Sequence, residues 1–138
     1  MKKLVCYTIL NLLIGSLSAQ TMKVKLKGVN YKVGGDMNIA IYNSEEGFLH
    51  VEHAVYLKKD KVVGEVQFFL IKEIPFGNYA IAVYHDENLD GRLNTNFMKI
   101  PSEGFGFSNN PGFGKPSYSK SVFEFDTDNQ QVIIEMNY

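Results

Sequence analysis

The chain has 138 residues and a mass of 15.6 kDa, which is about the size of one domain. Its 45% hydrophobic and 21% charged residues are ordinary for a globular protein and argue against disorder or a polytopic membrane protein. Without residues 1–19, the chain holds 12 Lys and Arg against 15 Asp and Glu. This weakly negative balance argues against nucleic-acid binding.

Residues 1–19 have the pattern of an export signal. Two lysines follow the first Met, an eleven-residue apolar run spans 4–14, and small residues lead to Ala19. The run is too short to cross a bilayer as a helix. We therefore expect a signal peptide over 1–19, one mature domain over 20–138, a periplasmic or secreted location, and no membrane insertion after cleavage. The only cysteine, Cys6, lies in the leader, so we expect no disulfide in the mature domain.

Alternating patterns and turn signals predict about seven short strands. In 22–27, apolar residues alternate with lysines, which is typical of a strand with one buried and one solvated face. The expected strands, in chain order, are 22–27, 37–42, 54–57, 62–71, 79–85, 121–126 and 131–137. Short strands separated by turns, with no long helix, predict an all-β fold: an antiparallel two-sheet β-sandwich.

The segments 44–60 and 62–71 have further features. Residues 44–60 favour a loop followed by a strand, with a turn at 59–61 (Lys-Asp-Lys). Within 62–71, alternation divides the side chains between two faces. Val66, Phe68 and Leu70 share one face, and Glu65, Gln67 and Phe69 share the other.

Between Asp86 and Lys120 the alternation stops. These 35 residues hold three of the four prolines and five of the twelve glycines. A loop of this length in a small domain is usually functional or packed by its own side chains. Its Gly-Phe-Gly segments at 104–106 and 112–114 lack the third glycine of a phosphate-binding loop, so we expect turns and packing there. The aromatic residues expected to hold the loop down are Phe97, Phe105, Phe107, Phe113 and Tyr118.

The segment 86–94 (DENLDGRLN) matches the opening of a calcium loop. Side-chain oxygens at alternate positions can converge on one cation, and a backbone carbonyl adds another ligand. The candidate ligands are Asp86, Asn88, Asp90 and Asn94 through their side chains and Arg92 through its carbonyl. The twelfth position, where an EF-hand has Glu, is Phe97, so calcium binding would be weak. The alternative is a run of Asx turns that needs no metal.

Three histidines are candidates for chemistry. His50 and His53 are too few for a zinc site, and we interpret them as a solvated pair. His85 ends the strand 79–85, on the face of Ile81 and Val83. It is expected to hold the long loop by a hydrogen bond, or to act as a general base beside Asp86.

Three segments together resemble the exported bacterial proteins of the DUF2141 family. They are 75–83 (PFGNYAIAV), 84–96 (YHDENLDGRLNTN) and 100–110 (IPSEGFGFSNN). The family pattern commonly has Asp at the position of Asn94, a departure that weakens the calcium interpretation. The resemblance implies an exported transthyretin-like or immunoglobulin-like sandwich and no particular reaction. It also implies that one constellation contains His85, Asp86, Glu103, Gly104, Phe107, Ser108 and Asn109.

The sequence therefore predicts an exported, non-enzymatic binding or structural module of the cell envelope. Calcium, a glycan, a peptide or an envelope protein is the expected ligand or partner. The alternative is a small periplasmic hydrolase that uses His85, Asp86 and Glu103. These groups would converge in an open cleft in a hydrolase, whereas in a scaffold they would bond to loop amides.

Overall fold

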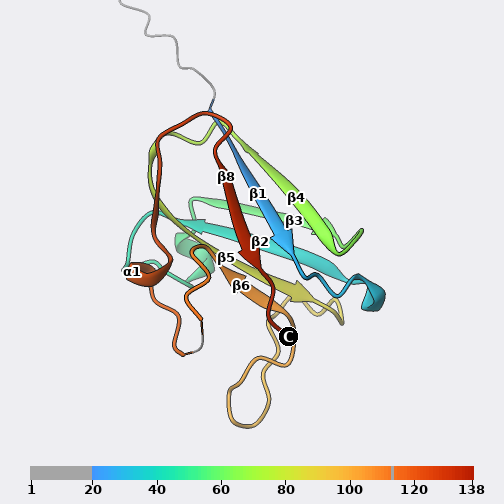
Figure 1. The fold of residues 1–138 in the computed structure, drawn as a ribbon. Coiled ribbons are helices and arrows are strands. Elements are labelled where there is room, and N and C mark those ends of the chain that lie inside the picture. The colour runs from blue at the N-terminus through green and yellow to red at the C-terminus, as the bar shows by residue number, and fades with distance from the viewer. Residues whose placement is uncertain (1–19, 113) are drawn as a thin grey trace, which may run out of the picture.

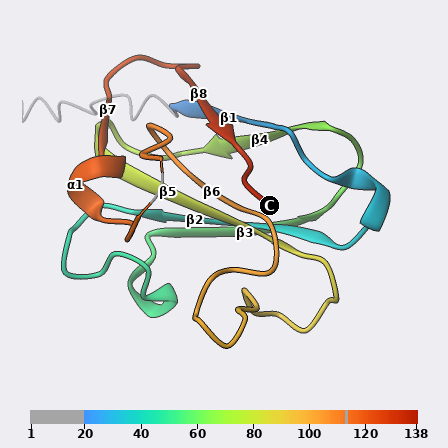
Figure 2. The same ribbon diagram turned by 60° about the horizontal axis from the view of Figure 1, so that its bottom comes forward.

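Two β-sheets pack face to face in the computed structural model, which describes residues 20–112 and 114–138 (Figures 1 and 2). The predicted signal peptide and Phe113 lie outside the described residues. One sheet has the order β4 (Val66–Lys72), β1 (Thr21–Lys27), β8 (Gln131–Glu135). The other has the order β3 (Tyr56–Lys61), β2 (Asp36–Tyr42), β5 (Gly77–Asp86), β6 (Phe105–Phe107), and β7 (Phe123–Phe125) also pairs with β5. The helical turns are η1 (Tyr31–Val33), η2 (Val51–His53) and α1 (Tyr118–Ser121).

All strand pairs are antiparallel except β1 with β8, which is parallel. The core lies between the two sheets and consists of the inward residues of each strand. On β1, Met22, Val24 and Leu26 are fully buried, and the intervening lysines face outward. Fully burying one such side chain contributes about 1.5–3 kcal/mol. The predicted all-β sandwich is confirmed.

The structure corrects the predicted turn at 59–61. These residues continue β3, because β2 pairs with β3 as far as Lys61. Lys59 also forms an ion pair with Asp36 on β2, with Nζ and Oδ2 3.4 Å apart. β3 lies at the edge of its sheet, where charged side chains are common because they oppose pairing with another chain. The charge cluster therefore marks an edge strand.

On β4, the buried face belongs to Gln67, Phe69 and Ile71. The apolar residues Val66, Phe68 and Leu70 share the opposite face and are about half exposed. Local alternation separates the two faces correctly. It does not reveal which one is buried, because the more apolar face is the exposed one and the buried face includes Gln67.

The segment 121–126 divides into two elements. Ser121 belongs to α1 and is buried, where its carbonyl oxygen accepts a 2.5 Å hydrogen bond from the Ser108 hydroxyl. The strand β7 covers only Phe123–Phe125, and Phe125 is fully buried against the core. The strand is therefore shorter than predicted at both ends.

The long loop contains a strand that the sequence did not predict. β6 is only three residues long and has Gly106 at its centre. A Cβ atom on Gly106 would lie 2.7 Å from Ile134 Cγ2 and 2.9 Å from the Glu135 carbonyl oxygen. Only glycine therefore allows β6 to approach β8 this closely.

The prediction that Phe97 holds this loop down is wrong. Phe97 is 94% exposed, because it lies at the turn of a short hairpin in which Thr95 and Pro101 form a β-bridge. Phe105, Phe107 and Tyr118 are half-buried. In Figure 1 the segment between β5 and β6 extends beyond the end of both sheets.

Candidate functional site

His85 lies at the end of β5 with no exposed surface, and both ring nitrogens have partners. Nε2 is 2.6 Å from the carbonyl oxygen of Gly34, and this oxygen can only accept, so Nε2 carries the hydrogen. Nδ1 then accepts a 2.8 Å hydrogen bond from the Tyr138 hydroxyl, which in turn accepts from the Asn30 amide at 2.9 Å. The imidazole thus joins three segments that are distant in sequence.

The Tyr138 ring also fixes the start of β6. It lies against Gly104, where a Cβ atom would overlap the ring. The Gly104 carbonyl accepts a 2.7 Å hydrogen bond from the His85 amide. Burial raises the pKa of the Tyr138 hydroxyl, the Asn30 amide opposes this rise, and the charge of Glu87 adds to it.

Asp86 and Glu103 hold the backbone of the loop between β5 and β6. The two Asp86 carboxylate oxygens accept from the amides of Asp90 and Gly91 at 3.0 and 2.9 Å. The two Glu103 oxygens accept from the amides of Glu87 and Asn94 at 3.0 and 2.8 Å. Both carboxylates are buried, and burying a carboxylate is tolerable when each oxygen is bonded in this way.

The predicted calcium segment forms Asx turns. Asn88 Oδ1 accepts from the Asp90 amide at 3.1 Å, and Asp90 Oδ1 accepts from the Arg92 amide at 2.9 Å. The Asn94 side-chain amide donates to Asp90 Oδ2 at 3.1 Å and is the largest cause of the lowered pKa of Asp90. The Asp86, Asn88 and Asp90 oxygens accept amide hydrogens, whereas Asn94 Oδ1 is buried without a hydrogen-bond partner. No cluster of three or more potential metal-binding side chains occurs within residues 20–112 and 114–138.

The remaining predicted residues lie farther back along β5. Ser108 is buried, and its hydroxyl oxygen accepts from the Ile81 amide at 2.8 Å. The Asn109 side chain donates to the Val122 carbonyl at 2.7 Å, and Phe107 pairs with Ala82. Four residues of extended chain separate Ile81 from His85, or about 13 Å. The structure therefore places the seven residues in two groups, one at each end of β6.

His85, Asp86 and Glu103 were expected either to form a hydrolase site or to hold the loop as a scaffold. His85 and Asp86 are at most 1% exposed, and all their polar side-chain atoms have protein partners. Glu103 bonds to loop amides. These hydrogen bonds close the base of the loop, the arrangement expected when the three side chains bond to loop amides. His50 and His53 are both exposed, as expected for a solvated pair.

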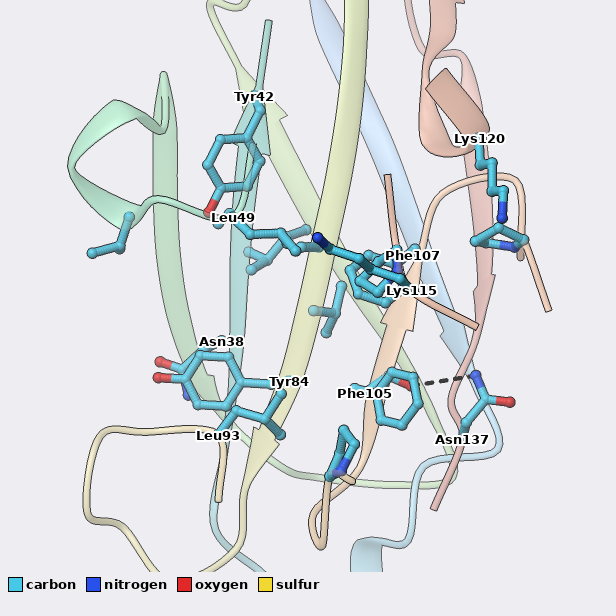
Figure 3. Close-up of a pocket in the computed structure, with 18 of the residues that line it drawn as sticks. Asn38, Tyr42, Leu49, Tyr84, Leu93, Phe105, Phe107, Lys115, Lys120 and Asn137 are labelled. Carbon is cyan, nitrogen blue, oxygen red and sulfur yellow. Dashed lines mark hydrogen bonds between the residues drawn. The ribbon is translucent and has the colours of Figure 1, made fainter. Parts of the chain in front are cut away.

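A hollow lies on the outer face of the β3–β2–β5–β6 sheet, away from the core (Figure 3). Strand register places four outward residues in one row across the strands: Leu57, Ala40, Ala82 and Phe107. The two alanines occupy the centre of this row, and larger side chains stand on either side. The short side chains in the middle therefore leave a depression in the sheet surface.

Irregular segments build the walls of the hollow. The loop between β5 and β6 contributes Leu93, Ile100 and Pro101, the η2 region contributes Leu49 and Val51, and residues 111–120 contribute Pro111 and Pro116. The hollow has a volume of about 1050 Å³, at the upper end of the ~300–1,000 Å³ typical of small-molecule sites.

Two tyrosines border the hollow. The Tyr84 hydroxyl donates to the Gly91 carbonyl at 3.2 Å, which ties the wall loop to β5. Burial raises the pKa of this hydroxyl, and the charges of Asp86, Glu103 and Asp90 add to the effect. Burial also raises the pKa of Tyr42, with a contribution from Glu52.

Sequence reasoning missed most of the residues that line this hollow. The available signal was Ala80 and Ala82 on one face of an otherwise bulky strand. Their importance depends on Ala40 lying directly opposite Ala82, and that register is not visible in a single strand.

A model of one protein family matches most of the chain. Residues 24–133 match the family described as "Uncharacterized protein conserved in bacteria (DUF2141)". The match covers most of the chain, so the protein belongs to this family and the predicted resemblance is confirmed. Neither the curated proteins nor the solved structures gave a significant match. Among the described residues, no helix is long and apolar enough to span a membrane.

Proposed function

We propose that this protein is an exported, non-enzymatic binding module of the bacterial cell envelope, and that its ligand occupies the hollow on the β3–β2–β5–β6 sheet. The observation that carries the proposal is the hollow of about 1050 Å³ built over the Ala40–Ala82 pair. A concave apolar surface of this size is the usual form of a small-molecule site. The apolar floor favours an apolar ligand over a glycan, which would need more polar partners.

The polar cluster at the end of β5 supports the non-enzymatic part of the proposal. A general acid or base must reach the proton that it transfers, and His85 has no exposed surface. Asp86 and Glu103 already accept hydrogen bonds from loop amides. Export is supported by the basic and apolar pattern of residues 1–19, and a test of export is the mass of the protein recovered from the envelope.

Binding can be tested with N-phenyl-1-naphthylamine, an uncharged dye that fluoresces in apolar surroundings. We expect the purified protein to enhance the fluorescence of this dye in a saturable way. The variant Ala82→Phe should lower the dye affinity at least about tenfold, because its ring fills the floor of the hollow; that corresponds to about 1.4 kcal/mol.

The matched control is Val63→Phe, which adds the same ring at a residue that is 79% exposed and outside the hollow. It should bind the dye like the unmodified protein. If Ala82→Phe does not fold, Ala40→Leu provides a smaller obstruction at the opposite residue. No dye binding by the unmodified protein, or equal affinity in folded Ala82→Phe, would contradict the proposal.

A further inference from the structure

The rim of the hollow carries positive charge. Among its lining residues are five lysines and no Asp or Glu: Lys58, Lys59, Lys99, Lys115 and Lys120. Lys58 and Lys59 form ion pairs with Asp60 and Asp36 at 3.2 and 3.4 Å. Within the described part of the chain, no ion pair involves Lys99, Lys115 or Lys120. Three ammonium groups therefore stand at an apolar surface without a carboxylate partner.

The three lysines come from different parts of the wall. Lys99 belongs to the hairpin between β5 and β6, Lys115 to the segment after β6, and Lys120 to α1. Figure 3 shows the Lys115 side chain lying across the hollow from the side of Phe107. A lysine can lay its methylene stem along apolar surface and keep its ammonium group at the water boundary. Lys115 therefore offers a cation directly above the apolar floor.

We propose that the ligand is a single-chain anionic amphiphile with a carboxylate head, that is, a fatty acid. This inference rests on the proposed function, because it assigns a chemical class to the ligand of the same hollow. The hydrocarbon chain lies on the Ala40–Ala82 floor between Leu57 and Phe107, where it displaces water from apolar surface. The carboxylate lies at the rim and accepts hydrogen bonds from the lysine ammonium groups.

Charge at the two ends of the hollow indicates where the head group lies. Glu52 is part of η2, beside the wall residues Leu49 and Val51, and its negative charge acts on Tyr42. A carboxylate at that end would be repelled, whereas Leu49 and Val51 offer contacts for hydrocarbon. The head group therefore lies at the lysines of the rim and not beside Glu52.

Displacement of N-phenyl-1-naphthylamine by twelve-carbon compounds tests this assignment. Dodecanoate, dodecanol and dodecyltrimethylammonium share one chain and differ in the charge of the head group. We expect dodecanoate to displace the dye at a concentration at least about tenfold lower than dodecanol, since three exposed charge contacts of about two- to threefold each multiply to about tenfold or more. The cation should displace the dye least well.

Substitution of the lysines locates the head group. Lys115→Gln should weaken dodecanoate binding about threefold. The triple variant that carries Lys99→Gln, Lys115→Gln and Lys120→Gln should weaken it about tenfold. Neither variant should change dodecanol binding. Lys32→Gln is the matched control, because this exposed lysine lies on η1 and does not line the hollow. It should leave dodecanoate binding unchanged.

The outcomes separate the two proposals. If the dye binds and dodecanol displaces it as well as dodecanoate does, the hollow is an apolar site and the assignment of a fatty acid is overturned. The assignment is also overturned if Lys32→Gln weakens dodecanoate binding as much as Lys115→Gln, since only overall charge would then matter. If the dye does not bind at all, the proposed function itself fails.

Discussion

The polar cluster at the end of β5 and the hollow on the outer sheet face use opposite kinds of residue. The cluster contains the groups that chemistry usually requires, and the polar side-chain atoms of His85 and Asp86 have partners within the chain. The hollow has a floor of alanine and aromatic side chains, and three of its lysines lack carboxylate partners among the described residues. The most conspicuous polar motif thus bonds to its own loop, whereas the small residues leave the hollow in which we propose that a ligand binds.

Removing the Asp86 carboxylate should produce the largest loss of stability. In Asp86→Ala the Gly91 amide loses its acceptor, and the Asp90 amide keeps only Asn88 Oδ1. We expect the free energy of unfolding to fall by about 3 kcal/mol, because two hydrogen bonds to a carboxylate are lost and such a bond contributes ~1.5–3 kcal/mol. Denaturant unfolding measures the change.

The control for this prediction is Asp60→Ala, which removes a carboxylate from an ion pair at the edge of the sheet. Partly exposed ion pairs contribute about 0–1 kcal/mol, so the control should unfold at nearly the same denaturant concentration as the unmodified protein. Equal effects of the two substitutions would show that Asp86 does not hold the loop. The polar cluster would then have no special role in the stability of the protein.

Removal of one hydroxyl from the cluster should have an intermediate effect. Tyr138→Phe deprives His85 Nδ1 of its donor and the Asn30 amide of its acceptor. At neutral pH we expect a loss of about 1–2 kcal/mol. Tyr31→Phe changes a half-exposed ring and is the control.

Tyr138 also predicts a dependence on alkaline pH. Burial raises its pKa in the folded state, so the folded protein retains this proton more firmly than the unfolded chain. The stabilisation is complete below the unfolded value of about 10 and is lost as the pH rises through the higher folded-state pKa. Unfolding measured from about pH 9 to about pH 11 should show a shallower decline for Tyr138→Phe than for the unmodified protein. Parallel declines would exclude this role.

Calcium should have the smallest effect. The Asp86 and Asp90 oxygens accept hydrogen bonds in the Asx turns, so we expect equal melting temperatures with calcium and with a chelator. Binding at about 100 times the dissociation constant would instead add about 2.7 kcal/mol. A rise of that kind, abolished in Asp90→Ala, would restore the calcium loop that the motif predicts and would make the cluster a ligand site.

Particular residues show how far the sequence predicted this structure. Alternation in 22–27 and 79–85 identified β1, β5 and the buried side of His85, because side-chain direction in a strand has a period of two. It did not identify β6, which is short and stabilised by pairing with β5. The motif 86–94 identified a tight loop, in which the oxygens of Asp86, Asn88 and Asp90 bond to loop amides. Local patterns do not specify which donors reach a given carboxylate.

The amino-acid sequence by itself determined the layered all-β fold and the family, because hydrophobic alternation and the motifs around His85 are local properties of the chain. Tertiary structure alone decided that Ala40 meets Ala82, that Phe68 faces outward, and that Asp86 bonds to its own loop. These facts depend on the register between strands and on the folding of irregular segments over the sheet. Such contacts join residues far apart in sequence, and the sequence of one strand does not specify which residue of another strand lies beside it.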